Sequence, residues 1–163
     1  MFFDFADIKK KSNESFFESL KLIKEFNSRI PMTISLNEHE GADLFSRFNI
    51  ACREEPGNIA SDLTIVRKEI GIDELVVHTP YFAVASSSGE GEGFAMQDFQ
   101  KNVIRTAGAG DSFNGGYISA SLGDLELKER LVVANAATSF FVTHATAPTK
   151  QEMIGQIERA ANK

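Results

Sequence analysis

Hydrophobic positions along the chain follow two spacings, and these predict strands and helices in turn. Short apolar runs at residues 1–5, 32–36, 74–78 and 81–85 predict strands, and a further strand is expected within 94–104. Apolar residues near helical spacing predict helices at 14–27, 38–48, 57–70, 110–122, 127–143 and 152–161. The Ser- and Gly-rich segment 86–93 is expected to be a loop.

The order of these elements predicts the fold class. Strands alternate with helices, apart from one hairpin that turns at Thr79-Pro80, and this favours a layered α/β/α fold with a mostly parallel sheet. No repeat and no linker interrupts the pattern, so residues 1–163 are expected to form a single α/β domain. Because the first strand begins at the very start of the chain, we expect its neighbours to lie upstream, in a fold truncated at its N-terminal side.

Composition and charge exclude several functions. Hydrophobic residues make up 42% and the formal net charge is −6, so a packed core is expected and nucleic-acid binding is not. The single cysteine, Cys52, cannot form an internal disulfide, which suits a reducing compartment. No secretory signal and no apolar run of the ~20 residues needed to span a bilayer is present. We therefore expect a cytoplasmic protein with no membrane partner.

The segment 106–117, TAGAGDSFNGGY, carries the clearest chemistry. Small residues at 107–110 let a ligand approach the backbone, and the helix that follows directs its N–H groups and its positive dipole end to the same place. Asp111 would repel a bound phosphate, but it suits a base that takes a proton from a hydroxyl attacking that phosphate. The alternative is a simple turn in which Asp111 is only the N-cap.

A second polar motif, Asn37-Glu38-His39-Glu40, directly follows a predicted strand. Oxygen ligands of this kind suit Mg²⁺, which usually keeps several of its waters. The alternative is a capping box, in which Asn37 caps the next helix and Glu40 is its partner. His39, His78 and His144 share no ligand spacing, so structural or surface roles are expected for them, with His144, near the predicted nucleotide end, as the best exception.

Residues 106–117 closely resemble the second signature of the ribokinase-like (PfkB-type) carbohydrate kinases, and 37–40 resemble that family's Asn-x-x-Glu motif. The stretches LVVHT, ANAATSF and HATAPT resemble further parts of the family's C-terminal, nucleotide-binding half. The resemblance implies an ATP-dependent phosphotransferase that acts on a sugar or related alcohol. It assigns roles residue by residue: Asp111 as base, Gly108, Ala109 and Gly110 as anion hole, Thr106 and Asn135 to the nucleotide, and Asn37 and Glu40 to Mg²⁺, largely through water.

The chain also departs from the family pattern. Arg105 stands where the family often has an Asp of its monovalent-cation site, so activation by a monovalent cation is in doubt. Nothing resembles the family's sugar-binding half or its lid. The expected ligands are therefore a nucleotide and a small sugar-like substrate, with a homo-oligomer or a missing N-terminal half left open. The alternative function is a non-catalytic nucleotide-binding module, or a half-protein that needs a partner chain.

Overall fold

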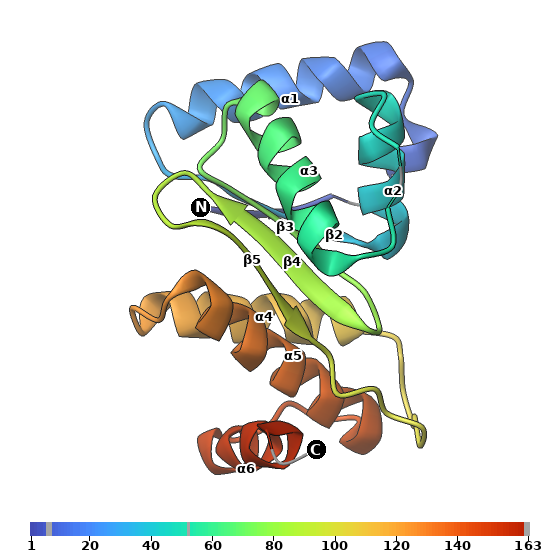
Figure 1. Cartoon of the computed structure of the whole chain (residues 1–163), viewed down its shortest axis with the longest axis vertical. Helices are drawn as coiled ribbons and strands as arrows, with labels where there is room; N and C mark the ends of the chain where they lie inside the picture. The colour runs from blue at the N-terminus through green and yellow to red at the C-terminus, as the bar shows by residue number, and fades with distance from the viewer. Residues whose placement is uncertain (6–7, 52, 162–163) are drawn as a thin grey trace. The chain divides into compact units, whose positions relative to one another are not determined.

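The computed structural model describes residues 1–5, 8–51 and 53–161, so Cys52 lies outside the described residues. Within these ranges, five strands form one sheet in the order β1-β2-β3-β4-β5 (Figure 1). The strands are β1 (Phe2–Asp4), β2 (Thr33–Asn37), β3 (Glu74–His78), β4 (Phe82–Ser87) and β5 (Gly91–Met96). The sheet is mixed and flanked by helices, which confirms the predicted layered α/β class.

The helices confirm the periodicity, with boundaries that move by one or two residues. They are α1 (Asn13–Asn27), α2 (Glu38–Arg47), α3 (Pro56–Ile70), α4 (Ala109–Leu122), α5 (Leu127–His144) and α6 (Lys150–Ala161). A short 3-10 turn, η1 (Ile8–Lys10), was not predicted. Local chemistry sets several ends: Pro56 is placed in the first turn of α3, and Gly71 ends that helix at φ +79°.

Strands β1, β2 and β3 pair in parallel. Ile34 of β2 lies opposite Leu75 of β3, and both side chains are buried. Ser35 and Val76, which point to the other face of the same strands, are buried as well. Burial on both faces is the pattern of a parallel sheet inside a layered fold.

The remaining strands form hairpins. The links 79–81 and 88–90 are too short for a parallel crossover, so β3, β4 and β5 run antiparallel in turn. The loop predicted over 86–93 is therefore wrong at both ends, since Ser86 and Ser87 end β4 and Gly91 begins β5. Ser86 tolerates full burial because its hydroxyl bonds Thr64 and accepts from Arg67, both on α3.

Two compact units make up the chain. Unit 1 comprises Met1–Thr79 and Val84–Gly93, and unit 2 comprises Pro80–Ala83 and Phe94–Lys163. The single domain expected over 1–163 stays a prediction. Within the described residues, no helix combines the length and the apolar character needed to cross a membrane.

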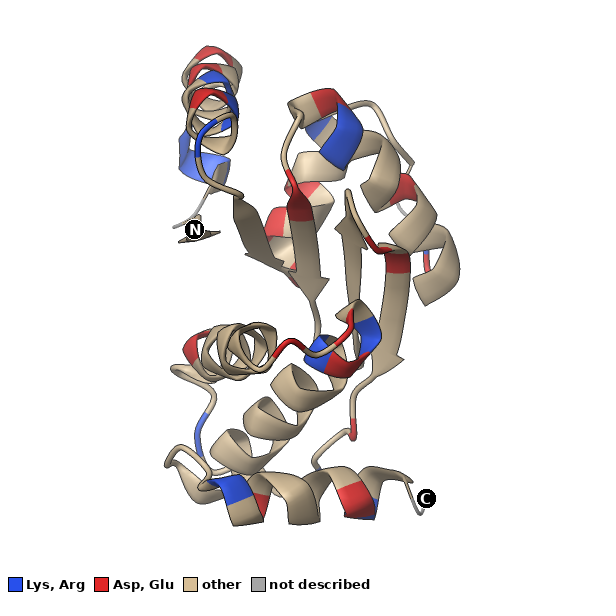
Figure 2. Ribbon diagram, turned by 90° about the vertical axis from the view of Figure 1, so that its left-hand side faces the viewer, with Lys and Arg blue, Asp and Glu red and all other residues tan. Residues whose placement is uncertain are grey.

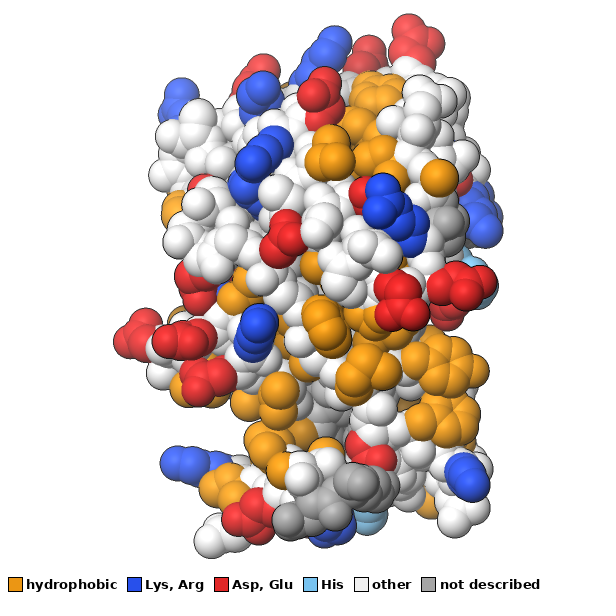
Figure 3. All heavy atoms as spheres, viewed as in Figure 1, with side chains coloured by type: hydrophobic (Ala, Val, Ile, Leu, Met, Phe, Trp, Pro, Cys, Tyr) orange, Lys and Arg blue, Asp and Glu red, His pale blue; other side chains and the backbone are white. Residues whose placement is uncertain are grey.

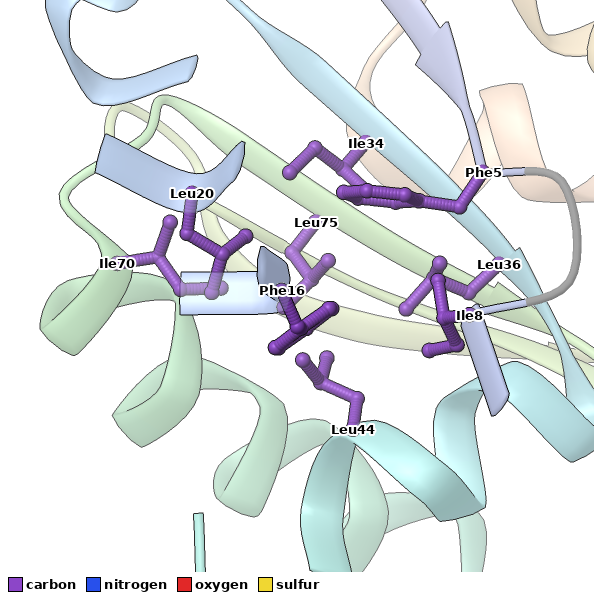
Figure 4. A pocket seen from close by; sticks show the side chains of 9 residues that line it. All are labelled: Phe5, Ile8, Phe16, Leu20, Ile34, Leu36, Leu44, Ile70 and Leu75. Atoms are coloured by element: carbon purple, nitrogen blue, oxygen red, sulfur yellow. The ribbon is translucent and has the colours of Figure 1, made fainter. Parts of the chain in front are cut away.

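The core of unit 1 lies between its helices and its strands (Figure 4). Apolar side chains from α1, α2, α3, η1, β2 and β3, with Phe5 just after β1, point toward one another around a gap too narrow to hold water. The lining residues are Phe5, Ile8, Phe16, Leu20, Ile34, Leu36, Leu44, Ile70 and Leu75. The gap is thus ordinary core packing and not a ligand site.

The core of unit 2 is the contact between α4 and α5. A Cβ at Gly116 would lie 2.9 Å from both the Ala134 Cα and the Ala137 Cβ, closer than side-chain carbons normally come. Glycine at this position and alanines on the facing helix therefore let the two backbones approach. Leu131, Ala134 and Phe140 of α5 are all buried.

Aromatic residues divide between core and surface. Phe16 and Phe140 are buried. Tyr81, Phe94 and Phe99 are each about half exposed. Figure 3 shows hydrophobic side chains gathered on one face around the end of β5 and the segment that follows it. The rings of Tyr81 and Phe99 stack with centroids 5.2 Å apart.

Replacing Gly116 with alanine tests the close approach of α4 to α5. The added methyl has no room, so Gly116→Ala should lower the free energy of unfolding by about 1–3 kcal/mol in urea denaturation. Gly115, one position earlier, faces open space, and Gly115→Ala should instead raise stability by up to about 1 kcal/mol through helix propensity. Equal effects at the two sites would show that the contact is not tight.

A second prediction concerns His78, the last residue of β3, where burial lowers the pKa of the imidazole from 6.5 to about 4. The folded protein favours the neutral ring, so this contribution to stability is complete above pH 6.5 and is lost as the pH falls toward 4. The loss should reach about 3 kcal/mol or less. His78→Gln should remove this part of the pH dependence, whereas His39→Gln, at an exposed position, should not. Identical pH profiles for both variants would contradict the assignment.

Candidate active site

The segment before α4 forms a tight turn. The Ala109 amide donates to the Thr106 carbonyl at 3.0 Å, and the first helical bond runs from the Ser112 amide to the Gly108 carbonyl, also at 3.0 Å. Gly108 is the N-cap and has φ +93°, a conformation that residues with a side chain rarely adopt. The sequence placed glycine at this turn, and the backbone gives the reason.

Asp111 occupies the third position of α4, not the N-cap. The alternative in which Asp111 caps the helix is therefore wrong: the cap is Gly108, and no side chain bonds the first amides. The carboxylate is exposed and has no hydrogen bond or ion pair within the described residues. Charges of both signs are spread over the ribbon (Figure 2), yet Asp111 is the one residue of α4 that is charged at neutral pH.

The amides of this first turn are unequal donors. The amide of Ala109 is already engaged by Thr106. In the described chain, the amides of Gly110 and Asp111 make no backbone bond to the preceding turn. Unbonded amides at a helix N-terminus, together with the helix dipole, favour an anion. Gly110 and Asp111 are therefore available donors in this helical turn. The anion hole expected at Gly108, Ala109 and Gly110 stays a prediction.

Helix α5 holds this turn in place. The Ser112 hydroxyl donates to the Ala137 carbonyl at 3.1 Å. The Phe141 Cζ would lie 3.1 Å from a Cβ at Gly108, and the Asp111 Oδ2 would lie 3.9 Å from the same point. Gly108 thus packs on the Phe141 ring, with the Asp111 carboxylate close by. The role of Phe141 could not be predicted, because contact between this ring and a glycine far away in the sequence leaves no local sequence signal.

Asn135 of α5 lies deeper than its expected role suggests. It is only 4% exposed, and its amide donates to the carbonyls of Ala95 and Met96. Its Oδ1 is buried and makes no hydrogen bond within the described residues. The Gln97 side chain donates to the Asn135 carbonyl and to Ser139, so this part of α5 holds the end of β5. Nucleotide contact by Asn135 stays a prediction.

Asn37 and Glu40, in unit 1, form the capping box given as the alternative. The Asn37 Oδ1 accepts from the amides of His39 and Glu40, and a Glu40 carboxylate oxygen accepts from the Asn37 amide at 2.9 Å. No cluster of three or more His, Cys, Asp or Glu residues able to hold a metal occurs in the described ranges. These side chains suit contact with a metal ion through its bound waters and not direct coordination.

Known proteins similar to this chain include a curated relative and several solved structures. A ribokinase of Haemophilus influenzae is 32% identical over 77 residues, which cover 45% of this chain and 25% of that protein. A nucleoside kinase of Methanocaldococcus jannaschii, described as an archaeal member of the ribokinase family, superposes with a TM-score of 0.68 at 21% identity. That match covers 97% of this chain and 48% of the kinase.

An Escherichia coli protein described as a putative ribokinase II in complex with ATP and Mg²⁺ superposes with a TM-score of 0.58 at 19% identity. It is matched over 96% of this chain and 48% of its own length. These likenesses show the fold, and the chain spans about half the length of both structures. The model of the prokaryotic ketohexokinase family matches residues 1–159. The chain therefore belongs to the prokaryotic ketohexokinase family.

Proposed function

We propose that this chain is the nucleotide-binding part of an ATP-dependent phosphotransferase that acts on a hydroxyl of a sugar or related alcohol. The observation that carries the proposal is the Asp111 carboxylate, which does not cap α4 and makes no hydrogen bond or ion pair within the described residues. An uncommitted carboxylate beside unbonded amides suits a base next to a phosphate site. Family membership and the ribokinase-like fold support the same chemistry.

In the proposed reaction, Asp111 takes the proton of the substrate hydroxyl while the hydroxyl oxygen forms a bond to the γ-phosphorus of ATP. The bond from that phosphorus to the bridging oxygen breaks, and the leaving ADP keeps the electron pair. The amides of Gly110 and Asp111 stabilise charge on the transferring phosphoryl group. The left-handed Gly108 and its packing on Phe141 fix the direction of those amides.

Mg²⁺ enters this proposal with the nucleotide. When bound, it would neutralise charge on the phosphate oxygens. Asn37 and Glu40 would contact its water shell, in keeping with side chains already committed to a capping box. Thr106 and Asn135 are proposed to contact the nucleotide. Thr106 is proposed because its carbonyl closes the turn before α4. Asn135 is proposed because its buried Oδ1 accepts no hydrogen bond within the described residues.

The rival function is nucleotide binding without chemistry, alone or with a partner chain. The match covers 48% of the nucleoside kinase, so the activity of a whole kinase is a proposal for this chain. Binding and turnover separate the two functions, because both require the phosphate site and only the kinase requires a base.

Nucleotide binding should depend on Gly108. Mg·ADP or Mg·ATP should bind weakly but measurably in calorimetry at millimolar concentration. Gly108→Ala should weaken that affinity about tenfold or more, because alanine is strained at φ +93° and its methyl would press on Phe141. Gly89→Ala, where the added methyl meets nothing, is the matched control and should leave affinity unchanged. Folded Gly108→Ala protein with native affinity would remove this turn from the site.

Asp111→Asn separates chemistry from binding. In a complete enzyme or complemented complex, turnover should fall about 10²–10⁴-fold, the usual contribution of a positioned base. Nucleotide affinity should hold or rise, since a negative charge leaves the phosphate site. Asp124→Asn, the same change at an exposed position just beyond the far end of α4, should alter neither property. Full turnover of the Asp111→Asn enzyme would assign this segment to binding alone.

A further inference from the structure

Arg105 is held in position by several contacts, although it lies on the surface. Its amide and that of Ile104 both donate to the Val142 carbonyl of α5, at 3.2 and 2.8 Å. Its Nε donates to the Ala107 carbonyl at 3.0 Å. Its Cζ lies over the Phe141 ring, 5.6 Å from the centroid. Two consecutive residues of α5 therefore fix both the backbone and the guanidinium of Arg105.

The same ring that carries Arg105 also packs on Gly108. The Phe141 Cζ would lie 3.1 Å from a Cβ at Gly108. The guanidinium thus shares its support with the N-cap of α4, and the Asp111 Oδ2 would lie 3.9 Å from that same Cβ. Arg105 and the N-cap of α4 therefore contact the same aromatic ring.

The guanidinium retains unused hydrogen-bonding capacity. Its Nε is used, while neither terminal nitrogen makes a hydrogen bond or ion pair within the described residues. Within those residues it also has no carboxylate partner, although the chain carries 23 acidic residues. An arginine fork that is oriented but not neutralised matches the geometry of a phosphate, which it can bind through two parallel bonds.

We infer that Arg105 binds the phosphate chain of the nucleotide and serves as a cation built into the site, with Phe141 as its positioning residue. The inference rests on the proposed function and adds a specificity-determining residue to it. Because the positive charge is covalently part of the chain, nucleotide binding needs no monovalent cation. If Arg105 had only a structural role, its guanidinium would serve to hydrogen-bond the Ala107 carbonyl. Replacing Arg105 would then lower stability without a selective effect on phosphate binding.

Calorimetry with phosphate-bearing probes distinguishes these roles. The probes are inorganic tripolyphosphate, ADP, and adenosine, which has no phosphate. Arg105→Gln should weaken tripolyphosphate and ADP binding about 10- to 100-fold and leave adenosine binding unchanged. Arg105→Lys keeps the charge and should recover part of the loss. Phe141→Leu should show the same selectivity for phosphate, to a smaller degree. Lys101→Gln, at an exposed residue of the same segment, is the charge-matched control and should have no effect.

Each outcome has a defined meaning. Equal ADP and tripolyphosphate affinity in Arg105→Gln and the unmodified chain overturns the inference and leaves the proposed function standing. A loss that is equal for all three probes, with a lower melting temperature, also overturns it in favour of a structural role. Failure of the unmodified chain to bind any phosphate probe overturns both. Exchange of potassium for sodium should change ADP affinity by less than about twofold, and a stronger potassium effect contradicts the built-in cation.

Discussion

The candidate site depends on the close approach of two helix backbones, α4 and α5, at Gly116. Only glycine fits there, because a Cβ at this position would lie 2.9 Å from both the Ala134 Cα and the Ala137 Cβ. That approach brings Ser112 within hydrogen-bonding distance of the Ala137 carbonyl and lays Gly108 on Phe141. These contacts with α5 hold the first turn of α4 in place. The direction of the Gly110 and Asp111 amides follows from this packing and not from any residue that touches a ligand.

An acidic chain can still offer a phosphate site, because the donors are local. The net charge is −6, yet the proposed ligands of the phosphate are two backbone amides and one oriented guanidinium. Backbone amides at a helix N-terminus act over short distances and are little affected by the average charge of the surface. Asp111 adds a negative charge within the same turn, where it interacts favourably with the helix dipole but would repel a bound phosphate.

Much of the fold was predictable from the sequence, because apolar spacing reports burial directly. The helices and the parallel strands followed from it. The segment 86–93 misled because Ser and Gly usually indicate loops, whereas here Thr64 and Arg67 of α3 satisfy Ser86 inside a strand. Tertiary hydrogen bonds of this kind leave no periodic signal. The Gly-Ala-Gly-Asp segment was identified from its residues, but the N-cap at Gly108 depends on a positive φ that no sequence pattern states. The contacts of Arg105 with Phe141 and Val142 likewise arise only in the folded chain.

The central claim is that phosphate binds at the first turn of α4. Amide NMR of the labelled chain during addition of Mg·ADP tests it most directly, because each amide reports separately. The account predicts the largest shift changes at Gly110 and Asp111, with smaller changes near Arg105 and Thr106 and none toward Leu122 at the far end of α4. Chemical-shift changes that saturate with Mg·ADP elsewhere in the chain, without any change at the amides of Gly110 and Asp111, would contradict it.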